Sequence, residues 1–209
     1  SGFLPPSKGV VQLDGDDITG LPADTITRLG IARTFQNIRL FPSMTALENV
    51  RTAQQMRSKS RLIDVLLNLP GFQRNERELE RMARGHLASL GLEEFADAPA
   101  VSLPYGYQRK LEIARALATE PRILLLDEPA AGMNPNETAE LVAFIQAIHD
   151  RFDLTIIVVE HDMSLIMPLC HRIQVLNYGR VIAEGTPDEI RVNADVIEAY
   201  LGTELEDQA

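Results

Sequence analysis

Cysteine is almost absent from this chain, since Cys170 is the single one among 209 residues. One thiol excludes an internal disulfide and is typical of a protein kept in a reducing compartment. No apolar stretch reaches the ~20 residues that a membrane-spanning helix needs, and no signal peptide is recognisable. Basic residues are also scarce: 20 Lys and Arg against 30 Asp and Glu give a formal charge of -10. Phosphate backbones attract positive surfaces, so this balance argues against a general nucleic-acid binder.

A phosphate-binding loop is missing as well. The pattern G-x-x-x-x-G-K-S/T does not occur, and the nearest glycine-to-lysine stretch, residues 2–8, has the wrong spacing and contains two prolines. The remaining composition is ordinary for a globular protein, because hydrophobic residues make up 45% and charged residues 24%. A chain of this length can form one large domain or a core with a smaller lobe.

Strand and helix patterns alternate along the chain, which predicts an α/β fold. The expected strands are 10–13, 31–35, 123–126, 154–159, 172–176 and 180–183. The expected helices are 24–29, much of 43–92, 108–118, 137–149 and a last one opened by Thr186 as N-cap and Pro187. Successive helix–strand units imply a parallel sheet, whereas the last two strands read as an antiparallel hairpin. Within 74–90 an apolar stripe at helical spacing accompanies a charge run, interpreted as a solvated face rather than a partner-binding patch.

The run ILLLDEP, residues 123–129, carries the strongest chemical signal. An all-apolar run of this length fits a strand buried on both faces of a parallel sheet, and such sheets place ligands at the carboxyl ends of their strands. Asp127 and Glu128 stand at that end. Neighbouring side chains of a strand point to opposite faces, so the pair needs an immediate turn to act together, and Pro129 favours one.

Two more polar residues follow strand ends. Gln36 follows the strand 31–35, and His161 follows the strand 154–159. Phosphoryl transfer to water needs a divalent cation, a group that activates the water and donors to the γ-phosphate, and these four side chains offer each function. Alone, each has a plainer reading as a surface or structural residue. Their joint order is what favours chemistry.

Five segments together carry a resemblance to a known family. They are RTFQNIRLFPSMTALENV (33–50), LPYGYQRKLEIARAL (103–117), ILLLDEPAAGMNP (123–135), VVEHDM (158–163) and GRVIAEGTPDEI (179–190). The chain resembles the nucleotide-binding subunits of ABC transporters over essentially its whole length, and most closely those of branched-chain amino-acid uptake. The resemblance implies a P-loop NTPase-like parallel sheet core, residues 1–36 and 119–209, with an inserted helical subdomain, residues 37–118, that bears the signature motif. The family's amino-terminal strands and P-loop are absent from these residues.

The resemblance also implies site residues. Gln36 matches the Q-loop residue, Asp127 the Walker B carboxylate that holds Mg²⁺, Glu128 the catalytic base and His161 the switch histidine. Gln36 would reach the same metal, partly through water. The signature loop, which contacts ATP held by the opposite subunit, corresponds to Leu103, Pro104, Tyr105, Gly106, Tyr107 and Gln108. We expect Tyr105-Gly106-Tyr107 to form a turn ahead of a helix whose free N–H groups attract an anion. Two residues depart from the pattern: Pro104 replaces the usual serine, and Asn134 replaces the usual D-loop aspartate.

The resemblance implies an ATPase that uses ATP and Mg²⁺ to energise amino-acid import from the cytoplasmic face of a bacterial inner membrane, where it is peripheral. Its implied partners are a second ATPase subunit, the transmembrane permease subunits and, indirectly, a solute-binding protein, with no nucleic acid. The apolar residues of the loop 37–48 would either receive a cytoplasmic helix of the permease or belong to the lobe core. The alternatives are a non-catalytic fragment that serves as a dimerisation or docking lobe, and an ABC ATPase of the ribosome or chromosome. Without a P-loop, the 209 residues should bind Mg-ATP weakly and leave an exposed apolar sheet edge.

Overall fold

The structure is a computed structural model that describes residues 1–55 and 70–201. The chain divides into two compact units, Ser1–Val159 and Glu160–Ala209. Residues 56–69, part of the predicted helical region, lie outside the described residues. Within the described part, no helix is both long enough and apolar enough to cross a bilayer. The predicted division into an ATPase core and a helical subdomain remains a prediction.

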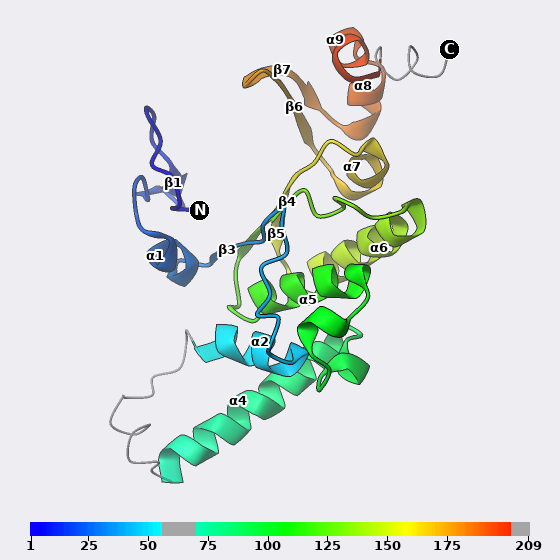
Figure 1. Ribbon diagram of the computed structural model, residues 1–209. Helices are drawn as coiled ribbons and strands as arrows, with labels where there is room; N and C mark the ends of the chain where they lie inside the picture. Colours follow the sequence, from blue (N-terminus) through cyan, green and yellow to red (C-terminus); the bar gives the residue numbers. More distant parts are fainter. Residues whose placement is uncertain (56–69, 202–209) are drawn as a thin grey trace. The chain divides into compact units, whose positions relative to one another are not determined.

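A three-stranded parallel sheet forms the centre of the first unit (Figure 1). Its order is β3 (Ile31–Arg33), β4 (Ile123–Asp127) and β5 (Thr155–Val159). Ile123 pairs with Ile31 on one side and with Thr155 on the other, so all three strands run in the same direction and end at the same edge. The predicted α/β class and parallel sheet are confirmed.

Burial of the sheet differs from the prediction. Leu124 and Leu126 of β4 are fully buried, whereas Ile123, Leu125 and Asp127, which point to the other face, are only half-buried. The expectation that this strand is buried on both faces is therefore wrong for the described residues, because the apolar run fills one face only. Strand β5 is more exposed still and pairs only with β4 in this sheet. Ile157 and Val159 are 51% and 60% exposed, which agrees with the predicted apolar edge.

Helices form the rest of the first unit. They are α1 (Ala23–Arg28), α2 (Ala46–Gln54), α4 (Pro70–Ser89), α5 (Tyr105–Leu117) and α6 (Pro135–Phe152), with the 3-10 turns η2 (Glu93–Phe95) and η3 (Ala100–Ser102) and a two-residue ladder of β1 (Gln12–Leu13) and β2 (Asp16–Asp17). Helix α2 packs against α4 and α5, while α5 also contacts β3 and α6 (Figure 1). Helix α5 therefore connects the helical part of this unit with its sheet.

Local sequence explains where these helices begin. Thr45 opens α2 with a capping box to Glu48, and Asn134 opens α6 with a capping box to Glu137. Each box satisfies backbone N–H groups that have no partner within the helix. Along α4, the expected apolar stripe holds except at Met82, which is 45% exposed, whereas Ala83 and Leu87 are fully buried.

The second unit consists of an antiparallel hairpin and short helices. Its elements are α7 (Met163–Leu169), β6 (Ile173–Asn177), β7 (Arg180–Gly185), α8 (Pro187–Arg191), α9 (Ala194–Val196) and a π-helical turn η4 (Ile197–Leu201). Tyr178 and Gly179 both have positive φ angles, 46° and 75°, which is the geometry that a two-residue hairpin turn requires. Thr186 opens α8 through a capping box, as predicted. This helix is not the last one, since α9 follows it.

Candidate functional site

Gln36 and Glu128 meet at the carboxyl edge of the sheet. Gln36 follows β3 by three residues, and Glu128 follows β4 directly. The side-chain amide Nε2 of Gln36 donates a hydrogen bond of 2.8 Å to Oε2 of Glu128. Parallel strands bring their carboxyl ends together, which is why two residues 92 positions apart in sequence become neighbours. This contact confirms the predicted convergence of Gln36 and Glu128.

Glu128 stands in a tight turn directly after Asp127. The φ angle of Glu128 is +43°, a left-handed conformation that residues other than glycine rarely adopt. Its N–H donates to the Val159 carbonyl at 2.8 Å, and its own carbonyl accepts from the N–H of Ala131 at 3.2 Å. The turn predicted from Pro129 is therefore present. Four other non-glycine residues among those described also have a positive φ, so the angle defines the turn and does not by itself indicate a function.

Asp127 pairs with a residue that the sequence analysis did not single out. NH2 of Arg33 lies 2.7 Å from Oδ2 of Asp127, and NH1 of Arg33 donates to the Ser1 hydroxyl at 2.7 Å. Both charged side chains are about one-third exposed, at 33% and 27%. Arg33 stands two residues after the start of β3, so Asp127 and Arg33 occupy neighbouring strands. This ion pair neutralises the carboxylate that the resemblance assigns to a metal.

The donor set near Asp127 suits magnesium only in part. The described residues contain no group of three or more His, Cys, Asp or Glu side chains that could enclose a metal ion. Mg²⁺ prefers oxygen ligands and commonly takes one or two carboxylates while keeping several waters. A carboxylate from Asp127 and an amide oxygen from Gln36 fit that chemistry, with water and phosphate completing the coordination. Magnesium would have to compete with Arg33 for Oδ2.

His161 belongs to the second unit, where it lies two residues beyond β5. Its side chain is 71% exposed, and its Nδ1 lies 3.4 Å from Oε2 of Glu160, a carboxylate that is itself 1% exposed. The backbone N–H of His161 donates to the same oxygen at 2.9 Å. The function of switch histidine that the resemblance implies for His161 remains a prediction.

The residues 103–108 differ locally from the expectation. Helix α5 begins at Tyr105 with Pro104 as its N-cap, so Tyr105-Gly106-Tyr107 form the first helical turn rather than a turn ahead of the helix. The predicted turn is wrong because Gly106 has an ordinary helical backbone angle and continues the helix that Tyr105 begins. The Leu103 carbonyl accepts from the Gln108 side chain at 2.8 Å. The start of α5 has no side-chain cap and no acidic residue in its first turn, unlike α2 and α6.

Asn134 has a structural function that the resemblance did not indicate. Its side-chain oxygen accepts from the N–H groups of Asn136 at 3.0 Å and of Glu137 at 3.1 Å. An aspartate could cap the helix equally well, so replacing aspartate by asparagine preserves this cap and removes one negative charge.

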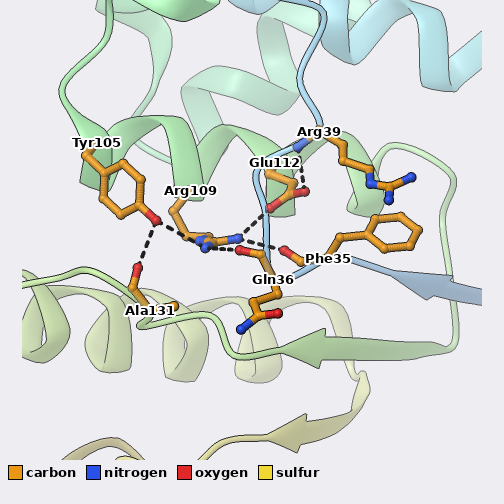
Figure 2. Close-up of polar contacts among 7 residues, drawn as sticks. All are labelled: Phe35, Gln36, Arg39, Tyr105, Arg109, Glu112 and Ala131. Carbon is orange, nitrogen blue, oxygen red and sulfur yellow. Dashed lines mark hydrogen bonds and ion pairs between the residues drawn. The ribbon is translucent and has the colours of Figure 1, made fainter.

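A buried ion pair of Arg109 and Glu112 contacts the backbone that leads into Gln36 (Figure 2). Arg109 and Glu112 lie on α5 at 0% and 1% exposure, with NH1 and Oε2 2.9 Å apart. NH1 of Arg109 also donates to the Phe35 carbonyl, and NH2 donates to the Gln36 carbonyl, both at 2.8 Å. This pair was not predicted from the sequence. Its signal, opposite charges three residues apart on a helix, equally describes a solvated helix face.

Comparison with known proteins identifies the family. A model described as ABC transporter matches residues 1–131, more than half of the chain. The chain belongs to the ABC transporter ATP-binding family. A second model, described as branched-chain amino acid ATP-binding cassette transporter, matches residues 180–206. The resemblance stated from the sequence motifs is therefore confirmed.

Relatives and solved structures agree with this assignment. The ABC chain is 48% identical over 202 residues to the high-affinity branched-chain amino acid transport ATP-binding protein BraF of Pseudomonas aeruginosa, covering 97% of this chain and 79% of BraF. The crystal structure of the ADP conformation of MJ1267, an ATP-binding cassette of an ABC transporter, has a TM-score of 0.79 at 27% identity, covering 97% and 80% of the two chains. The dimeric post-hydrolysis state of the ATP-binding cassette MJ0796 bound to ADP and Pi has a TM-score of 0.70 at 27% identity, covering 89% and 76%. The predicted P-loop NTPase-like fold is confirmed.

Proposed function

We propose that this ABC chain is the ATP-binding and ATP-hydrolysing subunit that energises the import of branched-chain amino acids. The BraF relative is named for that transport, and the second family model covers the same class of transporter. Within the chain, the supporting observation is the 2.8 Å hydrogen bond between Gln36 and Glu128. That bond brings an amide and a carboxylate together at the edge where α/β folds bind ligands.

Glu128 is proposed as the general base. When a water oxygen attacks the γ-phosphorus of ATP, the water proton passes to the Glu128 carboxylate and the bond to the ADP oxygen breaks. The positive φ of Glu128 fixes its direction, and the amide of Gln36 holds one carboxylate oxygen while leaving the other for the water. General bases of this kind contribute about 10² to 10⁴ in rate.

Asp127 and Gln36 are proposed to hold Mg²⁺, partly through water. When bound, the cation would neutralise charge on the β- and γ-phosphates. Asp127 would exchange its contact with Arg33 for the cation, since Arg33 is partly exposed and can turn outward. His161, two residues beyond β5, is proposed to donate a hydrogen bond to the γ-phosphate.

The start of α5 is proposed to bind the ATP of a second ATPase subunit. The segment from Leu103 to Gln108 presents uncapped N–H groups at the positive end of a 13-residue helix. Such an end attracts an anion, and the first turn of α5 itself contains no acidic residue, although the Glu137 carboxylate of α6 lies beside Gly106. Pro104 offers no side-chain donor, so the backbone must supply the contacts. Asn134 is proposed to lie near the same nucleotide. The MJ0796 structure is that of a dimer with ADP and Pi.

The remaining partners follow from the proposed transport function. The subunit would sit at the cytoplasmic face of the inner membrane beneath two permease subunits, with a solute-binding protein acting on the other side. The loop 37–48 is the proposed permease contact. Its Phe41 is 44% exposed, while its backbone is held by the Asn49 side chain through the Phe41 N–H at 2.9 Å and carbonyl at 3.2 Å. The resemblance is what supports this docking surface, since Phe41 is a single exposed ring and not a contiguous apolar patch.

The function is tested by reconstitution. The extended protein, meaning these residues with upstream sequence that supplies a phosphate-binding loop, is placed in proteoliposomes with its permease and solute-binding protein. We expect ATP hydrolysis and leucine uptake to rise together when leucine is supplied, and acidic or basic amino acids to give no such rise. Hydrolysis that is indifferent to leucine but responds to another solute class would overturn the substrate assignment.

A second comparison separates a catalytic subunit from a docking fragment. Mg-ATP binding and turnover are measured for the 209-residue chain and for the extended protein. We expect turnover only in the extended protein, because the sequence of the 209 residues lacks the G-x-x-x-x-G-K-S/T loop whose backbone N–H groups surround the phosphates. An extended protein that binds Mg-ATP without hydrolysing it would favour the non-catalytic alternative.

A further inference from the structure

Arg109 touches none of the proposed reacting groups, yet it contacts the backbone on both sides of the bond that joins Phe35 to Gln36. NH1 donates to the Phe35 carbonyl and NH2 to the Gln36 carbonyl, each at 2.8 Å (Figure 2). These two carbonyls belong to consecutive residues, so one planar guanidinium fixes the orientation of the chain that leads into the Gln36 side chain. That side chain is the one that donates to Glu128.

Glu112 holds Arg109 in this position. Its Oε2 accepts from NH1 of Arg109 at 2.9 Å, and its Oε1 accepts from the backbone N–H of Arg39 at 3.2 Å. The pair therefore binds three backbone groups of the segment 35–39 from one helix. The two side chains are 0% and 1% exposed, so water does not compete for these hydrogen bonds.

The same guanidinium also reaches the loop that follows Glu128. NH2 of Arg109 lies 3.4 Å from the hydroxyl of Tyr105, and that hydroxyl donates to the Ala131 carbonyl at 2.8 Å (Figure 2). Ala131 in turn donates its N–H to the Glu128 carbonyl. Four of the five N–H donors of Arg109 thus go to the Phe35 and Gln36 carbonyls, to Glu112 and to Tyr105, and Nε is left without a partner among the described residues.

We infer that Arg109, held by Glu112, is a positioning residue for ATP hydrolysis, because it fixes the backbone at Phe35 and Gln36 and so directs the Gln36 amide onto Glu128. The inference rests on the proposed function of Gln36 and Glu128. Helix α5 would then have a second function, in addition to the proposed nucleotide contact at its first turn. A shift of α5 would move Gln36 relative to Glu128 through this guanidinium.

Replacing Arg109 by lysine tests the inference in the extended protein. Lysine keeps a cation opposite Glu112, which favours folding, but one ammonium cannot reproduce the fork that grips two carbonyls. We expect kcat to fall about 10- to 100-fold, as small displacements of reacting groups do. We expect the KM for ATP to stay within about threefold of the parent value, because the substitution does not change the interactions that bind ATP equally in the ground state and in the transition state. The matched control is Arg84→Lys, since Arg84 makes a two-bond pair with Asp97 on the surface.

A double variant separates positioning from a merely structural effect. If Arg109 acts through Gln36, adding Arg109→Lys to Gln36→Ala should lower kcat by no more than about twofold beyond Gln36→Ala alone. The inference would be overturned if the double variant lost kcat by the product of the factors that the two single variants lose. It would also fail if Arg109→Lys matched Arg84→Lys in kcat, or if it raised KM while leaving kcat unchanged.

Amide hydrogen exchange provides a test that does not depend on activity. In the 209-residue chain, Arg109→Lys should speed exchange in residues 35–40 at least about fivefold, while exchange within α6 stays at the parent rate. Equal rates in 35–40 would contradict the clamp even if the chain hydrolysed nothing. If neither the parent nor the Arg84→Lys form of the extended protein hydrolysed ATP, the proposed function would be wrong. The exchange rates would still decide whether Arg109 holds residues 35–40.

Discussion

Replacing Arg109 by methionine should destabilise the chain strongly, because it leaves Glu112 as a buried carboxylate without its cation. Glu112 is 1% exposed and, among the described residues, would retain the Arg39 N–H as a hydrogen-bond donor and Arg115 as a neighbouring positive charge. Breaking a buried pair by removing one partner costs about 3–5 kcal/mol. Losing the hydrogen bonds to the Phe35 and Gln36 carbonyls adds less to the destabilisation, since Gln36 is exposed and water can replace the lost donor.

Urea unfolding followed by circular dichroism measures this effect in the 209-residue chain. With an m value of about 2 kcal/mol/M, a loss of about 3–5 kcal/mol lowers the unfolding midpoint by about 1.5–2.5 M. The double variant Arg109→Met, Glu112→Met removes both charges and should be more stable than either single variant. Arg84→Met is the surface control, because the pair of Arg84 with Asp97 is exposed.

Two outcomes would refute this reasoning. The first is a midpoint for Arg109→Met within about 0.25 M of the parent, which corresponds to the ±0.5 kcal/mol of ordinary surface changes. The second is a double variant less stable than both single variants, which would mean that packing rather than charge compensation dominates at α5.

Three further outcomes follow from individual side chains. Burial lowers the pKa of His86 and nearby Arg151 lowers it further, whereas the hydrogen bond to the Ala114 carbonyl and the charge of Glu120 act in the opposite direction. The folded chain therefore binds fewer protons than the unfolded chain and should lose stability as the pH falls below about 6.5. The urea midpoints at pH 7 and pH 5 should differ less for His86→Gln than for the parent. Asn134→Ala removes the cap of α6 and should cost about 1 kcal/mol, seen as a melting temperature lower by about 2–4 °C, whereas Asn134→Asp should match the parent. Burial raises the pKa of the Cys170 thiol, so iodoacetamide at pH 8 should alkylate it more slowly than a peptide cysteine, and an equal rate would show the thiol to be freely accessible.

Much of the fold could be predicted because local signals and tertiary structure agree. The strand 123–127 is an apolar run of the right length, and α8 begins where Thr186 and Pro187 predict a start. The beginning of α5 was misplaced because Gly106 suggests a turn, whereas Pro104 caps the helix one residue before Tyr105. Glycine permits a special backbone angle but does not require one.

The candidate site could be predicted in part. Gln36 and Glu128 were found because strand order brings them together, and that rule needs only the sequence of strands. Arg109 and Glu112 were missed because their burial depends on segments far away in the chain, with Phe35 74 residues from Arg109. An arginine and a glutamate three residues apart carry no sign of whether water or protein surrounds them. Arg33 was missed for the same reason, as its partner Asp127 is 94 residues away.

The most direct test of the proposed function is the hydrolysis rate of Glu128→Gln in the extended protein, measured with its affinity for ATP. Glutamine keeps the shape of the side chain and removes the base. The proposed mechanism predicts a loss of about 10²-fold or more in turnover with ATP binding unchanged within a few-fold, and a dimer that stays closed on bound ATP. Turnover within a few-fold of the parent would contradict the account and show that another group activates the water.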